Sequence, residues 1–260
     1  MDYKEIVFER KGDWGTLFLN RPEVLNALSD EMRAELFDFL QHAAVDRTLR
    51  VLIISGKGRA FSAGADLNVL KQRYENYRKD GQQDISQRMM LPRALATFPK
   101  PLIAAINGPA VGFGATMPLN CDIRIASIDA RFSFAFARLG VTPEFCSSYF
   151  LPRLVGLGQA AELIYTAKTI DAEEALRIGL INHLVQPEAL LPEAENIAAQ
   201  IAQLPPLSVH AAKRLLRHGI HSTLEQVIDY EGLIFQQASQ YEEHYIAVSQ
   251  RHADLNSSKK

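Results

Sequence analysis

Residues 51–67 read VLIISGKGRAFSAGADL, and residues 101–118 read PLIAAINGPAVGFGATMP. Each segment opens with a short apolar run, which is typical of a strand covered on both faces of its sheet. Each run then passes into a glycine-rich turn, where backbone N–H groups lack intrahelical partners. Two such amides aimed at one carbonyl oxygen stabilise the negative charge that develops on it. The two segments together therefore predict a site that acts on a carbonyl compound through the protein backbone.

The chain before and between these segments predicts alternating strands and helices. Residues 6–9 and 15–20 are β-rich runs that predict a hairpin. Ser29 followed by two acidic residues is a helix start signal. Residues 67–98 have a polar, helical pattern that contains Gly81, and they predict two helices with a mobile joint. These strand–helix–strand units favour an α/β core.

The chain after residue 118 predicts two more strands and then a region that is almost all helix. We place the strands at 122–127 and 130–135, expect the sheet to end near there, and expect one later short strand at 181–185. Long helical patterns occupy residues 188–203, 206–218 and 222–251. The last pattern carries apolar residues that would pack either on the core or on another subunit. They are Val227, Ile228, Leu233, Ile234 and Phe235.

The composition argues against several classes of partner. The 28 Lys and Arg residues against 30 Asp and Glu residues give a net charge of −2, without the surplus positive charge that nucleic acids or anionic membrane surfaces attract. Prolines and glycines interrupt the uncharged run 101–121, which disfavours a membrane-spanning helix. Cys121 and Cys146 form neither a disulfide framework nor a metal-ligand pattern. We expect a cytoplasmic protein, because the N-terminus lacks a signal-peptide pattern. We also expect no bound metal, because the sequence shows no metal-ligand pattern.

The sequence matches two other enzyme motifs only in part. Gly56 and Gly58 follow an apolar run as in a dinucleotide-binding loop, but the position of the third glycine holds Phe61. Ser62 lies in the sequence AFSAG, where an alanine replaces the first glycine of the G-x-S-x-G elbow of serine hydrolases. Both interpretations are weaker than the carbonyl-binding one.

The chain resembles the crotonase, or enoyl-CoA hydratase/isomerase, superfamily in motifs that run in order along it. The motifs are Asn20-Arg21-Pro22, Leu25-Asn26-Ala27-Leu28, FSAGAD at 61–66, NGPAVGFG at 107–114 and Cys121-Asp122. The resemblance implies an α/β fold of repeated ββα units, with a core over residues 1–195 and a helical trimerisation region over 196–260. It also implies a homotrimer or homohexamer that acts on an acyl-CoA thioester. No separate cofactor is implied, because CoA is part of the substrate.

Carried over position by position, the resemblance assigns two sets of residues. The oxyanion hole would be the backbone amides of Ala63 and Phe113. The first loop would hold the CoA moiety through backbone atoms, and two cations beside the loop would meet its phosphates or serve only as solvated surface charges. The assigned CoA-binding residues are Ala65, Asp66 and Leu67, with the cations Lys57 and Arg59.

The reaction depends on carboxylates, because one oxyanion hole can serve hydration, isomerisation, thioester hydrolysis and decarboxylation. Thr116 and Phe136 stand where the resemblance places the two glutamates of hydratases. Glu144, in LGVTPEFCSS at 139–148, resembles instead the single catalytic glutamate of the Δ3,Δ2-enoyl-CoA isomerase branch. One carboxylate placed between C2 and C4 of the acyl chain is sufficient to move a double bond from C3 to C2.

We therefore expect a Δ3,Δ2-enoyl-CoA isomerase, in which aromatic neighbours desolvate Glu144 and raise its pKa. Three alternatives remain open at this point. They are an enoyl-CoA hydratase that uses Glu144 alone, a non-catalytic acyl-CoA-binding protein of the same fold, and an acyl-CoA thioesterase or decarboxylase. Glu144 would have no catalytic role if it only capped the start of the helix that follows it.

Overall fold

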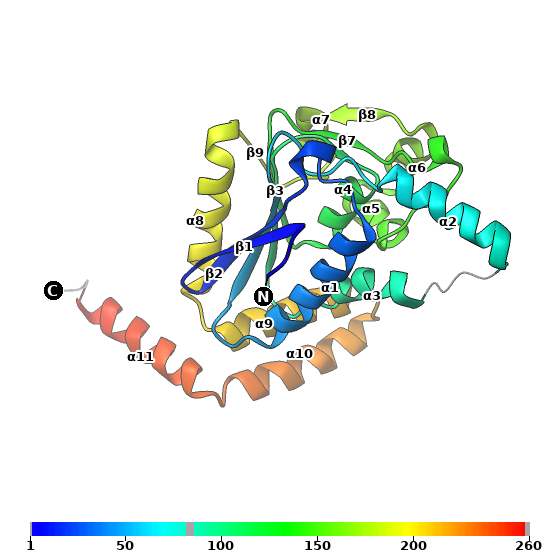
Figure 1. Cartoon of the computed structure of the whole chain (residues 1–260). Coiled ribbons are helices and arrows are strands. Elements are labelled where there is room, and N and C mark those ends of the chain that lie inside the picture. The colour runs from blue at the N-terminus through cyan, green and yellow to red at the C-terminus, as the bar shows by residue number, and fades with distance from the viewer. Residues whose placement is uncertain (1, 82–85, 258–260) are drawn as a thin grey trace.

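A six-stranded sheet forms the centre of the computed structural model, which describes residues 2–81 and 86–257 (Figure 1). The strand order is β1-β2-β3-β4-β6-β9. β1 and β2 form the predicted antiparallel hairpin, and the other neighbours pair in parallel. The strands are β1 (Ile6–Lys11), β2 (Trp14–Leu19), β3 (Val51–Gly56), β4 (Leu102–Ile106), β6 (Ile123–Ser127) and β9 (His183–Val185).

A second sheet has three short strands in the order β5-β7-β8. β5 pairs in parallel with β7, and β7 pairs antiparallel with β8. The strands are β5 (Ala110–Val111), β7 (Arg131–Ser133) and β8 (Thr169–Asp171). With helices between the strands, the predicted α/β class is confirmed.

The central sheet is covered on both faces, which explains its continuous apolar strands. Leu52 and Ile54 of β3 point into the large core that includes the first long helix, while Val51 and Ile53 point to the opposite face. That opposite face packs against α8 (Leu190–Ala202), whose buried side chains are mostly alanines. Because successive residues of a strand alternate between faces, both sets must be apolar when both faces are covered.

The first long helix, α1 (Asp30–Val45), begins where the sequence predicts. The hydroxyl of Ser29 accepts a hydrogen bond from the backbone N–H of Met32 at 2.9 Å. This bond satisfies one of the donors that a helix start leaves unpaired, and such a cap contributes about 1 kcal/mol. The helix buries apolar residues at three-to-four spacing, which are Met32, Leu36, Phe39, Leu40 and Ala43.

Two helices, α2 (Leu67–Asp80) and α3 (Ser86–Ala96), follow the first glycine loop as predicted. Gly81 ends α2 with a φ of +66°, a left-handed conformation that glycine adopts readily. Pro92 lies within α3. The predicted mobile joint falls on residues 82–85, which lie outside the described residues.

The C-terminal part differs from the prediction in two ways. The strands do not end near residue 135, because β8 joins the second sheet. The sequence analysis missed β8, since its three residues are too few to show a periodic pattern. The pattern at 222–251 forms two helices, α10 (Leu224–Ala238) and α11 (Glu242–Ser257). At the break, the hydroxyl of Ser239 donates to the carbonyl oxygen of Gln236 at 2.9 Å, a local bond that competes with helix continuation.

The remaining helices complete the layers around the sheets. They are α4 (Phe113–Thr116), α5 (Ser147–Val155), α6 (Leu157–Thr166), α7 (Ala172–Arg177) and α9 (Pro206–Gly219), with short 3-10 turns at Pro22–Val24, Met117–Asn120, Ala137–Leu139 and Pro187–Ala189. The boundary predicted at residue 195 falls inside α8.

Helices α10 and α11 extend away from the body of the molecule (Figure 1). Ile234 is buried, whereas Ile228, Leu233 and Phe235 are exposed. One member of the predicted apolar set is thus buried within the chain, and the burial of the exposed members in a subunit contact stays a prediction. Within the described ranges, no helix is long and apolar enough to cross a membrane.

Candidate active site

The two glycine loops, residues 58–67 and 107–118, lie directly against each other. The backbone N–H of Val111 donates to the carbonyl oxygen of Ser62 at 2.9 Å. A Cβ atom on Gly114 would lie 2.2 Å from the same Ser62 oxygen, so this contact requires glycine at position 114. The close approach of two backbones fixes the positions of the amides that both loops present.

The amides of Ala65 and Phe113 are among those of the two loops that have no acceptor in the described chain. Neither N–H donates to an acceptor among the described residues, and Phe113 is the first residue of α4, where a helix leaves its N–H groups unpaired. The N–H of Ala63 instead donates to the carbonyl oxygen of Leu25 at 2.8 Å. Ala63 was predicted to donate to the substrate oxygen in the oxyanion hole, but its N–H is already engaged within the protein. The same prediction for Phe113 is compatible with its unpaired N–H.

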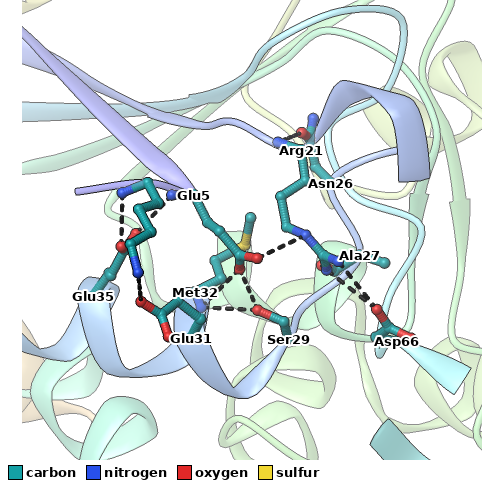
Figure 2. A network of polar contacts seen from close by, with 10 residues as sticks. Glu5, Arg21, Asn26, Ala27, Ser29, Glu31, Met32, Glu35 and Asp66 are labelled. Carbon is teal, nitrogen blue, oxygen red and sulfur yellow. Dashed lines mark hydrogen bonds and ion pairs between the residues drawn. The ribbon is translucent and has the colours of Figure 1, made fainter. Parts of the chain in front are cut away.

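A charged network holds the first loop in place (Figure 2). The guanidinium of Arg21 lies between the carboxylates of Glu5, at 3.1 Å, and Asp66, at 3.3 Å. It also donates to the carbonyl oxygen of Ala27 at 2.7 Å. The second oxygen of Asp66 accepts the N–H of Asn68 at 3.0 Å and caps α2. The Asp66 carboxylate is therefore occupied within the protein, and the predicted contact of CoA with the backbone of Asp66 stays a prediction.

Asn26 is a second support of the same loop. Its buried side-chain amide donates to the carbonyl oxygens of Lys57 and Ala60 at 2.9 and 2.8 Å. The backbone carbonyl oxygen of Asn26 accepts a hydrogen bond from the hydroxyl of Ser62 at 2.8 Å. Asn26 has a φ of +56°, a conformation that asparagine tolerates better than most residues. The motif residues around Asn26 thus shape the loop, and the buried Ser62 hydroxyl is a structural donor.

The other residues predicted to bind CoA differ in how available they are. The ammonium of Lys57 pairs with Glu9 at 2.6 Å and lies 3.7 Å from the ring centroid of Phe18. Arg59 is exposed, and within the described chain its guanidinium has no hydrogen bond or ion pair. Leu67 is exposed as well. Arg59 is therefore the more available of the two predicted cations.

Glu144 precedes a strained turn at the start of α5. Phe145 and Cys146 have φ values of +51° and +59°, and each such non-glycine residue costs about 1–3 kcal/mol. The N-cap of α5 is Cys146, and no side chain makes the capping hydrogen bond. The alternative in which the Glu144 carboxylate caps this helix is thus not supported. Strain of this kind is found where surrounding structure fixes a functional side chain.

An aromatic contact links Glu144 to the free amide of Phe113. The ring of Phe145, the residue after Glu144, lies edge-on to the ring of Phe113 with centroids 4.9 Å apart. Glu144 is half-buried, and burial raises the pKa of its carboxyl above the ordinary value. The positive charges of Arg33 and Arg73 act in the opposite direction and lower that pKa. Glu144 and the unpaired amide of Phe113 therefore lie in neighbouring segments of the chain.

Arg33 is a residue of this region that the sequence analysis missed. Its guanidinium carbon lies 5.6 Å from the centroid of the Phe145 ring. Its Nε atom is buried and has no acceptor among the described residues. Because Arg33 lies on α1 and Glu144 lies far away along the chain, no local pattern in the sequence joins them.

The two positions that hold glutamates in the hydratase pattern cannot serve as acids or bases here. Thr116 is fully buried in α4, with its hydroxyl 3.4 Å from the carbonyl oxygen of Phe113. Phe136 is buried in the core. Burial raises the pKa of the Cys121 thiol to about 12, so this residue does not form a nucleophilic thiolate near neutral pH. In the described part of the chain, no cluster of His, Cys, Asp or Glu is suited to a metal.

A cavity of about 520 Å³ lies away from these residues, between the end of α3 and helices α9 and α10. Its polar wall is engaged internally: the ammonium of Lys213 pairs with Asp122 at 2.7 Å and donates to the carbonyl oxygen of Lys100 at 2.6 Å. None of the predicted site residues lines this cavity. The chemistry-bearing groups are therefore those around the glycine loops and Glu144.

Comparison with known proteins gives a consistent picture. Residues 13–250 match the family described as enoyl-CoA hydratase/isomerase. A crotonyl-CoA hydratase of Syntrophomonas wolfei is 37% identical, over 90% of each chain. A 1,2-epoxyphenylacetyl-CoA isomerase of Escherichia coli is also 37% identical, over 83% of each chain. Sequence identity thus does not separate hydratases from isomerases among these relatives.

Solved structures show the same fold. The crystal structure of an enoyl-CoA hydratase from Bacillus anthracis aligns with a TM-score of 0.90 at 30% identity, covering 96% of this chain and 97% of the other. An enoyl-CoA hydratase structure from Geobacillus kaustophilus aligns with a TM-score of 0.89 at 29% identity. The expectation of a crotonase fold with a helical C-terminal region is confirmed.

Proposed function

Because the chain belongs to the enoyl-CoA hydratase/isomerase family of acyl-CoA-processing enzymes, we propose that it is a Δ3,Δ2-enoyl-CoA isomerase with Glu144 as its single base. The observation that carries the proposal is the contact between Phe113 and Phe145. It supports a site in which the unpaired amide of Phe113 and the partly desolvated carboxyl of Glu144 act on one substrate, while Thr116 and Phe136 provide no second carboxylate.

In this mechanism the thioester carbonyl oxygen accepts hydrogen bonds from the N–H groups of Ala65 and Phe113. The Glu144 carboxylate removes a proton from C2, and the electron pair of the C–H bond passes into the thioester to form a dienolate. The two amides stabilise the negative charge on oxygen, and removal of one such donor typically lowers kcat about 10²–10³-fold. The Glu144 carboxyl then returns a proton to C4. A double bond forms between C2 and C3, and Glu144 is a carboxylate again.

The environment of Glu144 suits both halves of this proton transfer. Burial disfavours the charged carboxylate and raises its pKa toward the range in which a group both accepts and returns a proton efficiently. Arg33 and Arg73 limit this rise, because their positive charges favour the carboxylate. The two arginines therefore keep more of Glu144 in the carboxylate form than burial alone would allow.

In this proposal, the outer part of the first glycine loop, residues 58–67, binds the CoA moiety. The backbone of Ala65 and Leu67 faces the pantetheine and adenine parts, and Arg59 meets a phosphate. Asp66 supports the loop from behind through Arg21. The exposed apolar residues of α10 and α11 would form the contact between subunits of a homotrimer or homohexamer.

Hydration is the second candidate, because the relatives include a crotonyl-CoA hydratase and a short-chain-enoyl-CoA hydratase at 37% and 36% identity. Glu144 alone would then have to activate water and complete protonation at C2. The products separate the two reactions: hydration of a 2-enoyl-CoA yields a 3-hydroxyacyl-CoA, whereas isomerisation yields no hydroxyl compound.

The test is product identification from 3-enoyl-CoA and 2-enoyl-CoA esters of two chain lengths, by NMR or mass-resolved chromatography. The wild type should convert 3-enoyl-CoA to 2-enoyl-CoA, and Glu144→Gln should bind the ester without converting it. Glu23→Gln removes an exposed carboxylate outside the site and is the matched control. A 3-hydroxyacyl product would favour hydration instead. Tight binding without any product would favour the non-catalytic alternative.

A further inference from the structure

The turn that follows Glu144 holds two successive peptide groups in an unusual orientation. Phe145 and Cys146 both have left-handed backbone conformations, with φ values of +51° and +59°, which non-glycine residues rarely adopt. The first peptide is held locally, because the carbonyl oxygen of Glu144 accepts the N–H of Ser147 at 3.0 Å. The second peptide, which carries the carbonyl oxygen of Phe145, depends on a side chain from another part of the sequence.

Asn120 supplies the donor for that second peptide. Its Nδ2 atom donates to the carbonyl oxygen of Phe145 at 3.0 Å, across 25 positions of the sequence. The described residues provide this oxygen with no other donor. The same Nδ2 faces the carbonyl oxygens of Thr116 and Met117 at 3.2 and 3.4 Å. Because three carbonyl oxygens lie on one side, the NH₂ group of the amide must point toward them, which fixes the orientation of the side chain.

A buried asparagine at position 120 carries a cost that an apolar side chain would avoid. Asn120 is fully buried, and its Oδ1 atom has no hydrogen-bond partner in the part of the chain that the structure describes. An unpaired buried polar atom is destabilising. Leucine, which has a similar branched shape, would remove this cost but would leave the Phe145 carbonyl without its donor. The amide is therefore best explained by the turn that it holds.

The backbone before Asn120 joins this turn to the other part of the candidate site. Residues 113–120 run without interruption through α4 and the 3-10 turn after it. The segment thus begins with the amide of Phe113 and ends with the side chain that holds Phe145. The rings of Phe113 and Phe145 are also in contact. The guanidinium of Arg217 on α9 donates to the backbone carbonyl oxygen of Asn120 at 2.8 Å and anchors the end of the segment.

We propose that Asn120 is a positioning residue, which holds the turn after Glu144 and thereby fixes the Glu144 carboxylate relative to the amide of Phe113. This role rests on the proposed function, because it requires that the carboxylate and the amide act on one substrate. The Asn120 side chain itself makes no contact with the thioester in this role. Loss of its hydrogen bond should therefore lower kcat and leave the affinity for acyl-CoA unchanged.

The kinetic test compares Asn120→Leu with Ser147→Ala as the matched control. Ser147 is buried at the start of α5, and its hydroxyl has no partner within the described ranges. Asn120→Leu should lower kcat for a 3-enoyl-CoA about 10–10²-fold, as expected when a reacting group is displaced. Its affinity for a saturated acyl-CoA should equal that of the wild type. Ser147→Ala should keep the wild-type kcat, because it removes no hydrogen bond from the turn.

Two kinetic outcomes would overturn the proposal. One is a wild-type kcat in Asn120→Leu, and the other is an equal loss of kcat in Ser147→Ala, which would indicate a general sensitivity of the region. Asn120→Ala removes the same amide without adding bulk, and it provides the comparison where the leucine variant does not fold.

The titration of the Glu144 carboxyl gives a second readout, which does not depend on turnover. Burial raises the pKa of this carboxyl, and the positive charges of Arg33 and Arg73 lower it. Both arginines stay in place in Asn120→Leu. When the turn relaxes, the carboxylate gains access to water, so its pKa should fall toward that of an exposed glutamate. NMR of protein labelled at the glutamate carboxyl carbons measures this pKa, and Glu144→Gln identifies the signal.

The two readouts separate this proposal from the proposed function. A lower pKa of Glu144 in Asn120→Leu, in a protein that does not isomerise 3-enoyl-CoA, would remove the proposed function and leave the positioning of Glu144. Isomerisation by the wild type, with the same kcat and the same pKa of Glu144 in Asn120→Leu, would do the reverse.

Discussion

The two halves of the candidate site are built differently. The oxyanion half, residues 58–67 and 107–118, is held mainly by backbone hydrogen bonds and by buried amide contacts such as those of Asn26. The acid–base half brings Glu144 together with Arg33 and Arg73 from two other helices, through side-chain charge and ring contacts. A backbone site tolerates many substrates because any thioester offers the same oxygen. The reaction and the substrate class must therefore reside in the side-chain half.

The largest effect is expected in the acid–base half, from Glu144→Gln. Loss of a general base lowers the rate by about 10²–10⁴-fold, whereas the affinity for a saturated acyl-CoA should stay within about twofold because the amides still bind the oxygen. Steady-state kinetics with a 3-enoyl-CoA and calorimetry measure the two quantities. A wild-type kcat in Glu144→Gln would mean that another residue is the base, and the acid–base half would then not contain the reacting carboxylate.

The oxyanion half should respond next most strongly, through Gly114→Ala. The new Cβ meets the carbonyl oxygen of Ser62 at 2.2 Å, so the two loops must separate and the amide of Phe113 must move. We expect kcat to fall about 10²-fold together with the midpoint of thermal unfolding. Gly232→Ala, on an exposed face of α10 with no atom within 4 Å of the new Cβ, should raise the free energy of unfolding by about 0.5–1 kcal/mol. Equal behaviour of the two variants would contradict the role of the close contact.

Asn26→Ala tests whether the oxyanion half depends on its buried amide. The substitution removes the side-chain donor of the Lys57 carbonyl oxygen and the shorter of the two donors to the Ala60 carbonyl oxygen, and we expect the free energy of unfolding to fall by about 2–4 kcal/mol. Asn68→Ala, in the exposed first turn of α2, should change it by less than about 0.5 kcal/mol. Urea denaturation of both variants provides the comparison. Equal stability of both would mean that the backbone bonds alone hold the loop.

The pH dependence of kcat/KM reports on the acid–base half. The base must be a carboxylate, and burial raises its pKa, so activity should be full above that pKa and fall as the pH drops through it, above the range of an exposed glutamate. Arg33→Gln removes a positive charge that lowers the pKa of Glu144. The acid limb should therefore move to higher pH in this variant. An acid limb of the kcat/KM profile that stays in place or moves to lower pH would show that the charge of Arg33 does not act on the base.

The smallest effect is expected at the outer edge of the oxyanion half, from Arg59→Gln. An exposed cation that meets a phosphate contributes at most about 1 kcal/mol, so KM should rise about two- to fivefold and the effect should vanish at high salt. Lys57→Gln should change KM less, because the Lys57 ammonium already pairs with Glu9. A larger effect at Lys57 would reverse this assignment.

The same contrast explains what could be predicted from the sequence. The strands of the central sheet, the Ser29 cap and the two glycine loops follow from local patterns, and the structure places them as predicted. The choice between Ala63 and Ala65 does not follow from a local pattern, because the acceptor that engages Ala63 is the carbonyl oxygen of Leu25 on another segment. Arg33 was missed for a related reason: only the packing of α1 brings it next to Phe145.

The most direct test of the account follows the C2 protons of a 3-enoyl-CoA in D₂O by NMR, with the wild type and with Glu144→Gln at saturating protein. In the wild type the C2 proton signal should disappear while 2-enoyl-CoA accumulates, because Glu144 takes the proton from C2 as the two amides stabilise the dienolate. In Glu144→Gln the bound ester should keep its C2 protons. Equal loss of the C2 signal in both proteins would contradict the account, since proton removal would then not depend on Glu144.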